Sequence, residues 1–90
     1  FNLYQNHPNP FNPIITINYD LPKNCFISIT IYDMLGNVVK NLINNNQLSG
    51  YRSVIWDATD NLGQLVSAGA YLYTIEAGIY RETKKMILLK

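Results

Sequence analysis

The sequence has few of the residues that build catalytic, metal-binding or disulfide-bonded sites. Its 90 residues include one cysteine, Cys25, and one histidine, His7. A lone cysteine cannot form a disulfide within the chain, and a single histidine supplies neither a metal cluster nor a Ser-His-Asp triad. A glycine-rich phosphate loop and an Asn-x-Ser/Thr sequon are also missing. We therefore predict that the protein is not an enzyme and has no catalytic, cofactor-binding or metal-binding residues.

An excess of one charge and long hydrophobic runs are missing as well. Seven basic and six acidic residues give a formal net charge of +1, so no strong field favours nucleic acid or a membrane surface. The chain has no run of about 18 apolar residues, which predicts that it forms no transmembrane helix. Its hydrophobic content of 48% is sufficient for the core of one small domain and excludes a disordered chain.

Hydrophobic and polar residues alternate over most of the chain, as is typical of half-buried β-strands. The alternation predicts strands over residues 15–21, 25–31, 38–42, 51–56, 69–77 and 80–89. Their spacing favours an all-β fold, an immunoglobulin-like antiparallel β-sandwich of about six or seven short strands. The side chains expected to anchor the core lie on the apolar faces of these strands: Ile27, Ile29, Ile31, Val54, Trp56, Tyr71, Tyr73 and Ile75.

Two polar segments between the strands are expected to be irregular. Residues 44–47 read NNNQ and are predicted to form a polar loop, and residues 57–64 form a turn-rich connection. Asp57, Asp60 and Asn61 offer oxygen atoms, but their spacing misses the calcium-loop pattern, so we interpret them as turn formers.

The last two strands each leave one question open. Tyr71 stands near the start of the penultimate strand, where its hydroxyl would bond back to the backbone as a tyrosine corner; alternatively it is a large core residue. In the last strand, Met86–Leu89 reads MILL and is apolar on both faces. The alternation therefore does not predict which of these four residues are buried.

The first 13 residues differ in composition from the rest. The stretch NHPNPFNP, residues 6–13, has three prolines and three asparagines around Phe11. Proline fixes φ and is disfavoured in helix interiors and in central strands. We therefore expect an extended proline-rich N-terminal arm over residues 1–13 and an Ig-like β-sandwich over residues 14–90. The sequence leaves open whether Phe11 packs on its own domain or on a neighbouring subunit.

Several motifs occur in the order seen in a known family. The chain resembles the type IX secretion system (type A) C-terminal sorting domains, which stand at the ends of secreted proteins of the Bacteroidetes. The motifs that carry this resemblance are NPFNP, TINYDLP, IYDMLGNVV, GYRSVIWDATDNLGQLVSAGAYLY and ETKKMILLK. The block from Gly50 to Tyr73 equally resembles the Ig-like domain of the flagellar hook-capping protein FlgD. The resemblance to the sorting domains covers Phe1 to Lys90 and rests on several motifs.

The resemblance implies a delivery function without catalysis. Such domains are recognised by an outer-membrane translocon and removed by a sortase-like peptidase. Their cargo is secreted or displayed at the cell surface after passing through the periplasm of a Gram-negative bacterium. The recognition residues implied by the family motifs are Pro8, Asn9, Pro10, Phe11, Gly69, Ala70, Tyr71, Lys85 and Lys90. Ala70 departs from the valine common in the family, and the strand is expected to tolerate this change.

Two other functions stay open on the sequence alone. An extended arm with apolar residues can complete the sheet of a neighbouring subunit, which predicts a homo-oligomer or an extracellular filament. The resemblance to FlgD instead implies an Ig accessory module with a flagellar partner. No sequence feature favours a cofactor for any of the three functions.

Overall fold

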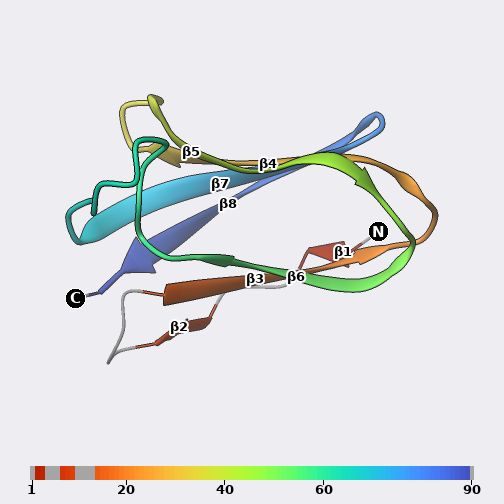
Figure 1. Ribbon diagram of the computed structural model, residues 1–90, viewed down its shortest axis with the longest axis horizontal. Helices are drawn as coiled ribbons and strands as arrows, with labels where there is room; N and C mark the ends of the chain where they lie inside the picture. Colours follow the sequence, from red (N-terminus) through yellow and green to blue (C-terminus); the bar gives the residue numbers. More distant parts are fainter. Residues whose placement is uncertain (1, 4–6, 10–13, 90) are drawn as a thin grey trace.

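Two antiparallel sheets stack face to face in the computed structural model, which describes residues 2–3, 7–9 and 14–89 (Figure 1). The strands are β1 (Asn2–Leu3), β2 (His7–Asn9), β3 (Ile14–Leu21), β4 (Cys25–Asp33), β5 (Val38–Gln47), β6 (Gly50–Trp56), β7 (Gly69–Ala77) and β8 (Tyr80–Leu88). The predicted all-β sandwich is confirmed. Over the described ranges, no helix is long and apolar enough to cross a membrane.

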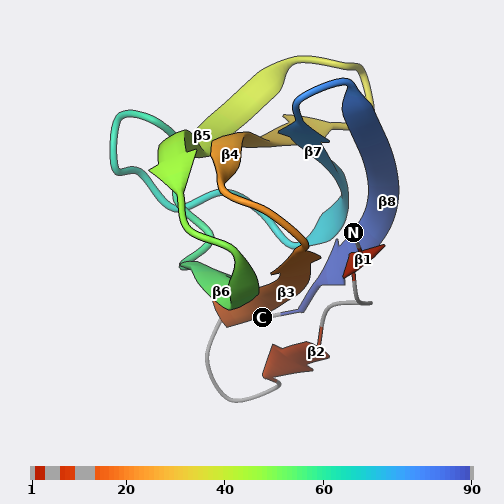
Figure 2. The same cartoon turned by 90° about the vertical axis from the view of Figure 1, so that its right-hand side faces the viewer.

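The two sheets differ in how they use the start of the chain. One sheet has the strand order β5-β4-β7-β8, whereas the other is centred on β3 and has β6 on one side. On the other side of β3, Leu3 of β1 lies opposite Tyr19, and His7 of β2 lies opposite Thr16. The two short strands therefore act as one interrupted strand along β3, within the same chain. Figure 2 shows the two layers nearly end-on.

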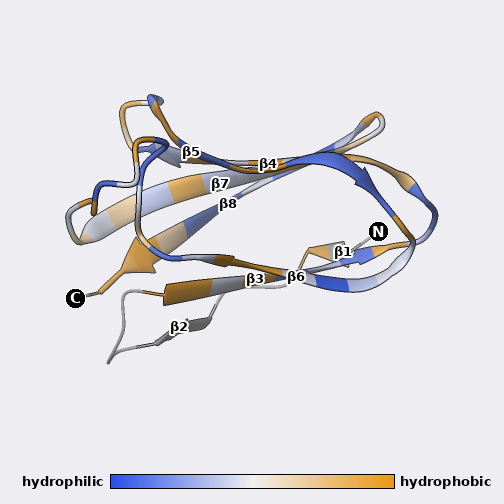
Figure 3. Ribbon diagram, viewed as in Figure 1, coloured by the Kyte–Doolittle hydropathy of each residue, from blue (hydrophilic) through white to orange (hydrophobic). Residues whose placement is uncertain are grey.

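The core lies between the sheets because the alternating residues of β3, β4 and β7 direct their apolar side chains inward. Trp56 and Tyr73 are fully buried. Burying a large apolar side chain contributes about 1.5–3 kcal/mol. The other expected core residues that the structure places in this buried cluster are Ile27, Ile29, Ile31, Tyr71 and Ile75. Val54 is only half-buried against the cluster, because it lies on the edge strand β6. Figure 3 shows the apolar segments of the strands.

The loop predicted at residues 44–47 is wrong, because these residues belong to β5. Asn44 pairs with Ser28 and Gln47 pairs with Cys25, in register with the first half of β4. β5 is an edge strand, and the face of this strand that points away from the core is exposed to solvent. Its backbone therefore completes the ladder without an apolar alternation. Two register shifts also place extra residues in β5, and Val39 and Leu42 reach the core there. These bulges interrupt the period-2 pattern, which is why the predicted strand ended before the end of β5.

The β7–β8 hairpin follows the predicted turn chemistry. Ala77 and Tyr80 are the last paired residues, and Gly78 and Ile79 form the turn between them. Gly78 has φ of 63°, a left-handed conformation that glycine adopts without a Cβ clash. The tight turn fixes the register of β8 against β7 along its whole length.

Candidate functional site

The motif residues that the structure describes gather at one end of the sandwich. Pro8 and Asn9 lie on β2 beside the start of β3. Gly69–Tyr71 begins β7, and Lys85 lies on β8 opposite Leu72. Figure 1 shows β2, the start of β7 and the end of β8 toward the same end of the molecule. Segments that are far apart in the sequence therefore form one terminal surface.

A continuous series of contacts links β2 to β8 across this end. Ile15 of β3 lies opposite Pro8 on one side and opposite Trp56 on the other. The indole of Trp56 meets the ring of Tyr71 edge to face, with ring centroids 5.2 Å apart and planes at 71°. Tyr71 in turn pairs with Met86 of β8. Edge-to-face aromatic pairs add about 0.5–1.5 kcal/mol beyond the buried area, so this path stabilises the terminal surface.

Three of the recognition residues implied by the family motifs lie outside the described residues. These are Pro10, Phe11 and Lys90. The packing of Phe11 and the role of all three therefore stay predictions.

Tyr71 satisfies both interpretations drawn from the sequence. It is buried in the core, with 7% of its surface exposed. Its hydroxyl donates a hydrogen bond to the carbonyl oxygen of Ser67 over 2.6 Å, which is the back-bond of a tyrosine corner. The indole Nε1 of Trp56 donates to the carbonyl oxygen of Thr59 at 2.9 Å. Both aromatic residues thus hold the β6–β7 connection, residues 57–68, against the sandwich.

The carboxylates of this connection act on its own backbone. The Asp60 Oδ1 accepts hydrogen bonds from the backbone N–H groups of Leu62 and Gln64, at 2.9 and 3.0 Å. The Thr59 hydroxyl and N–H bond to Asp57, and the hydroxyl is the largest cause of the lowered pKa of that carboxyl. These bonds are those of Asx turns. In the described part of the chain, no group of three or more His, Cys, Asp or Glu residues forms a metal-binding cluster.

The same connection covers the outer edge of β5, a contact that the sequence did not predict. The backbone N–H of Asn61 donates to the carbonyl oxygen of Val39 at 3.0 Å. The Asn61 side-chain oxygen accepts the N–H of Asn41, also at 3.0 Å. The Lys40 ammonium donates to the Asp60 carbonyl oxygen over 3.1 Å. Asn61 therefore pairs with the bulged edge as a short strand would.

The C-terminal half of the last strand buries alternate residues. Met86 and Leu88 are buried, with 2% and 1% of their surface exposed, whereas Ile87 and Leu89 are 46% and 49% exposed. This resolves the ambiguity of the MILL segment. The exposed Lys85 shares the outer face with Ile87. The sequence carried no signal for this parity, because the adjacent Lys84 and Lys85 lie on opposite faces of the strand.

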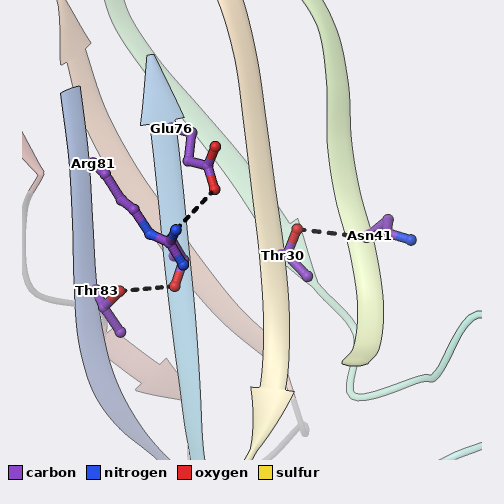
Figure 4. Close-up of polar contacts among 6 residues, drawn as sticks. Thr30, Asn41, Glu76, Arg81 and Thr83 are labelled. Carbon is purple, nitrogen blue, oxygen red and sulfur yellow. Dashed lines mark hydrogen bonds and ion pairs between the residues drawn. The ribbon is translucent and has the colours of Figure 1, made fainter. Parts of the chain in front are cut away.

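Polar side chains cross the outer face of the β5-β4-β7-β8 sheet. The Thr30 hydroxyl bonds to the side-chain oxygen of Asn41 at 3.4 Å, and the hydroxyls of Thr74 and Thr83 are 2.8 Å apart (Figure 4). Cross-strand pairs of this kind stabilise a sheet by roughly 0.2–1 kcal/mol each. Thr74 is buried, and its hydroxyl has a partner in the hydroxyl of Thr83.

A pocket of about 490 Å³ lies at the opposite end of the sandwich, between the β3–β4 turn and the β7–β8 hairpin. Its lining consists of Pro22, Lys23, Cys25, Ala77, Gly78, Ile79 and Tyr80. This set is mostly apolar and includes none of the nine recognition residues implied by the family motifs.

Comparisons with known proteins agree with the resemblance seen in the motifs. The sequence matches the family described as "Secretion system C-terminal sorting domain" over residues 5–89. A search of the curated proteins gave no match. Among solved structures, FlgD from P. aeruginosa superposes with a TM-score of 0.65 and 25% identity, over 83% of this chain and 60% of that chain.

A second solved structure shares the fold. Dimeric latent PorU from Porphyromonas gingivalis superposes with a TM-score of 0.69 and 21% identity, over 96% of this chain. The present chain spans 9% of the PorU chain. At this identity the likeness shows a common architecture, and it agrees with the Ig-like sandwich.

The family match, the order of the motifs and the shared architecture lead to one conclusion. The match covers all but the first four residues and the last one. The chain belongs to the family of secretion system C-terminal sorting domains and carries a C-terminal sorting signal for type IX secretion.

Proposed function

We propose that this domain is a non-catalytic delivery module, which directs an attached cargo protein through the type IX system to the cell surface or exterior. The observation that carries the proposal is the match to the sorting-domain family over residues 5–89. The gathering of the described motif residues at one end of the sandwich supports it. The proposed partners are an outer-membrane translocon and a sortase-like peptidase, which meet the domain after it has crossed the periplasm.

The motif residues have two kinds of proposed role. Gly69–Tyr71 positions the terminal surface, because Tyr71 holds the 57–68 connection and pairs with β8. Lys85 is exposed and contributes charge to the surface that the translocon contacts. The motif from Pro8 to Phe11 marks the boundary between cargo and sorting domain, and Lys90 adds a second positive charge at the end.

The two alternative functions gain less support. A filament built through the N-terminal arm requires that arm to complete a neighbouring sheet, whereas β1 and β2 pair with β3 of their own chain. The similarity to FlgD at 25% identity reflects the fold, and no contact among the described residues favours a flagellar partner.

The proposal is tested by export of a reporter fused to Phe1–Lys90 in a host that has a type IX system. Deleting residues 85–90 removes the terminal motif but also the buried Met86 and Leu88, so a substitution must accompany the deletion. Lys85→Gln keeps the core intact and is expected to lower the exported fraction. Lys23→Gln changes an exposed lysine at the opposite end of the sandwich and is expected to leave export unchanged. Undiminished export of both the deletion and Lys85→Gln would refute the proposal.

A further inference from the structure

The edges of the two sheets are blocked to very different degrees. An edge strand exposes backbone N–H and C=O groups that pair with other strands unless something prevents it. On the side of β3 away from β6, the edge is formed by strands of two and three residues, and Pro8 within β2 has no N–H to donate. On β5, two bulges and the bonds from Asn61 to Val39 and Asn41 occupy the edge. Neither edge offers a long regular ladder to a partner.

Charged side chains that point inward protect two further stretches of edge, β6 and the first half of β8. Arg52 lies near the middle of β6, in register with the buried Tyr19, and its Nε donates to the side-chain oxygen of Gln47 at 3.5 Å. In the first half of β8, Glu82 and Lys84 form an ion pair at 3.7 Å, and both side chains are largely covered. Inward-pointing charges of this kind resist the pairing of a foreign strand, because pairing would dehydrate them.

The second half of β8 has none of these features. Its register with β7 runs without a shift to the pair Gly69–Leu88. From Met86 onward it carries no charge and no proline before Lys90. Among the described residues, no strand other than β7 pairs with β8, and Figure 2 shows β8 at the margin of its sheet. This stretch is a regular, uncharged length of edge.

The hairpin geometry indicates which backbone groups face that open edge. A two-residue turn makes Ala77–Tyr80 the hydrogen-bonded closing pair, and bonded and non-bonded pairs alternate from there. Met86 and Leu88 therefore exchange hydrogen bonds with β7. Ile87 lies between them and directs its N–H and C=O away from β7, as do Lys85 and Leu89 by the same alternation.

We propose that the edge formed by Lys85–Leu89 accepts an extended segment of the export machinery as an added β-strand. The inference rests on the proposed function and specifies how the signal is recognised. Main-chain hydrogen bonds to Ile87 supply the affinity, as in other cases of strand addition. The partner segment pairs an apolar side chain with Ile87 and carries an acidic residue toward Lys85, the exposed basic residue within this edge.

A second copy of this chain fits the same edge poorly. Two-fold antiparallel pairing along the whole of β8 would be centred on Lys84 and would set this lysine against its own copy. Like charges directly opposite one another destabilise a strand pair. The charge pattern therefore favours an acidic partner over self-association.

The test compares loss of a backbone donor with loss of a side chain. Ile87→Pro removes the outward N–H and leaves the β7 ladder intact, and export of the reporter fused to Phe1–Lys90 is expected to fall about tenfold or more. Ile87→Ala keeps the N–H and is expected to lose less than about threefold. Arg81→Pro makes the same backbone change in the protected half of β8 and is expected to export normally.

A second variant covers the case in which Ile87→Pro does not fold, as judged by thermal unfolding of the purified chain. Leu89→Pro changes a residue beyond the last paired residue of β8, so it cannot break the ladder, and it is expected to lower export as well.

Full export of both folded proline variants, or equal losses for Ile87→Pro and Ile87→Ala, would overturn strand addition while leaving the proposed function standing. An unmodified fusion that stays inside the cell overturns both. Sedimentation that shows a dimer lost in Ile87→Pro would assign the edge to a second copy and overturn the proposed partner.

Discussion

Tyr71 shows how a motif residue of the family acts through structure. Its ring packs against Trp56 and its hydroxyl bonds to the Ser67 carbonyl oxygen. The residue therefore connects the core, the 57–68 connection and the start of β7. Because the side chain is buried, we propose that Tyr71 affects recognition only indirectly.

Replacing Tyr71 with phenylalanine keeps the ring and removes the hydroxyl. We expect the free energy of unfolding to fall by about 1 kcal/mol, since one hydrogen bond is lost and the Ser67 carbonyl oxygen keeps no side-chain partner. Urea denaturation followed by Trp56 fluorescence measures the change. Tyr51→Phe, at a tyrosine that is 86% exposed, is the matched control and should leave the midpoint where it is. Equal midpoints for wild type and Tyr71→Phe would contradict the role of the hydroxyl.

Asp33 makes the stability of the β4–β5 turn depend on pH. Its Oδ1 accepts the backbone N–H groups of Leu35 and Asn37, each at 2.9 Å. The hydrogen bond from the Asn37 backbone is the main cause that lowers the pKa of Asp33. A carboxyl whose pKa is lower in the folded than in the unfolded chain stabilises the fold above the unfolded value of about 3.9, and this contribution is lost as the pH falls through the lowered pKa.

Asp33→Asn should therefore flatten the acid limb of the stability curve. At about pH 6 the wild type is expected to be more stable than the variant, and the gap should close as the pH falls to about 2. Urea midpoints across this range measure it. A gap that stays constant with pH would show that ionisation of Asp33 does not stabilise the turn.

At the scale of elements, the sequence predicts the inner strands of the sheets better than the edge strand β5. β3, β4 and β7 are covered on one face and paired on both sides, so their alternation is clear and the predicted strands were correct. β5 lies at an edge and contains two bulges, so the polar run Asn44–Gln47 looked like a loop. The coverage of that edge by Asn61 could not be predicted, because it joins residues 20 positions apart through a side-chain oxygen.

Asn61→Ala tests this coverage. The variant keeps the backbone bond to Val39 but loses the acceptor for the Asn41 N–H, so we expect a loss of about 1 kcal/mol or less. The more specific readout is hydrogen exchange, which should become faster at the Asn41 amide than in the wild type. Asn45→Ala, at an exposed residue of the same strand, should leave that amide unchanged. Unaltered exchange in Asn61→Ala would mean that the 57–68 connection does not cover β5.

At the scale of the whole molecule, the fold brings together motif residues that are far apart in the sequence. Pro8 and Asn9, the segment Gly69–Tyr71 and Lys85 come from three distant parts of the chain, and the sandwich brings them to one end. Period-2 patterns predicted the fold class because a small core needs little more than correct alternation. They could not predict this convergence, since the order of strands in the sheets depends on long-range pairing.

The open edge of β8 lies at the same end of the molecule. Recognition of a backbone edge depends on the shape and register of the strand more than on its side chains. We therefore propose that the export machinery recognises a folded surface of this domain and not a linear peptide.

Whether this domain is an export signal is tested by the fraction of reporter found outside the cell when it carries Phe1–Lys90. The fusion is expressed in a host with a type IX system and in an otherwise identical strain without its translocon. We expect export from the first strain and retention by the second. Equal amounts of external reporter in the two strains would contradict it, because the domain would then carry no signal for this system.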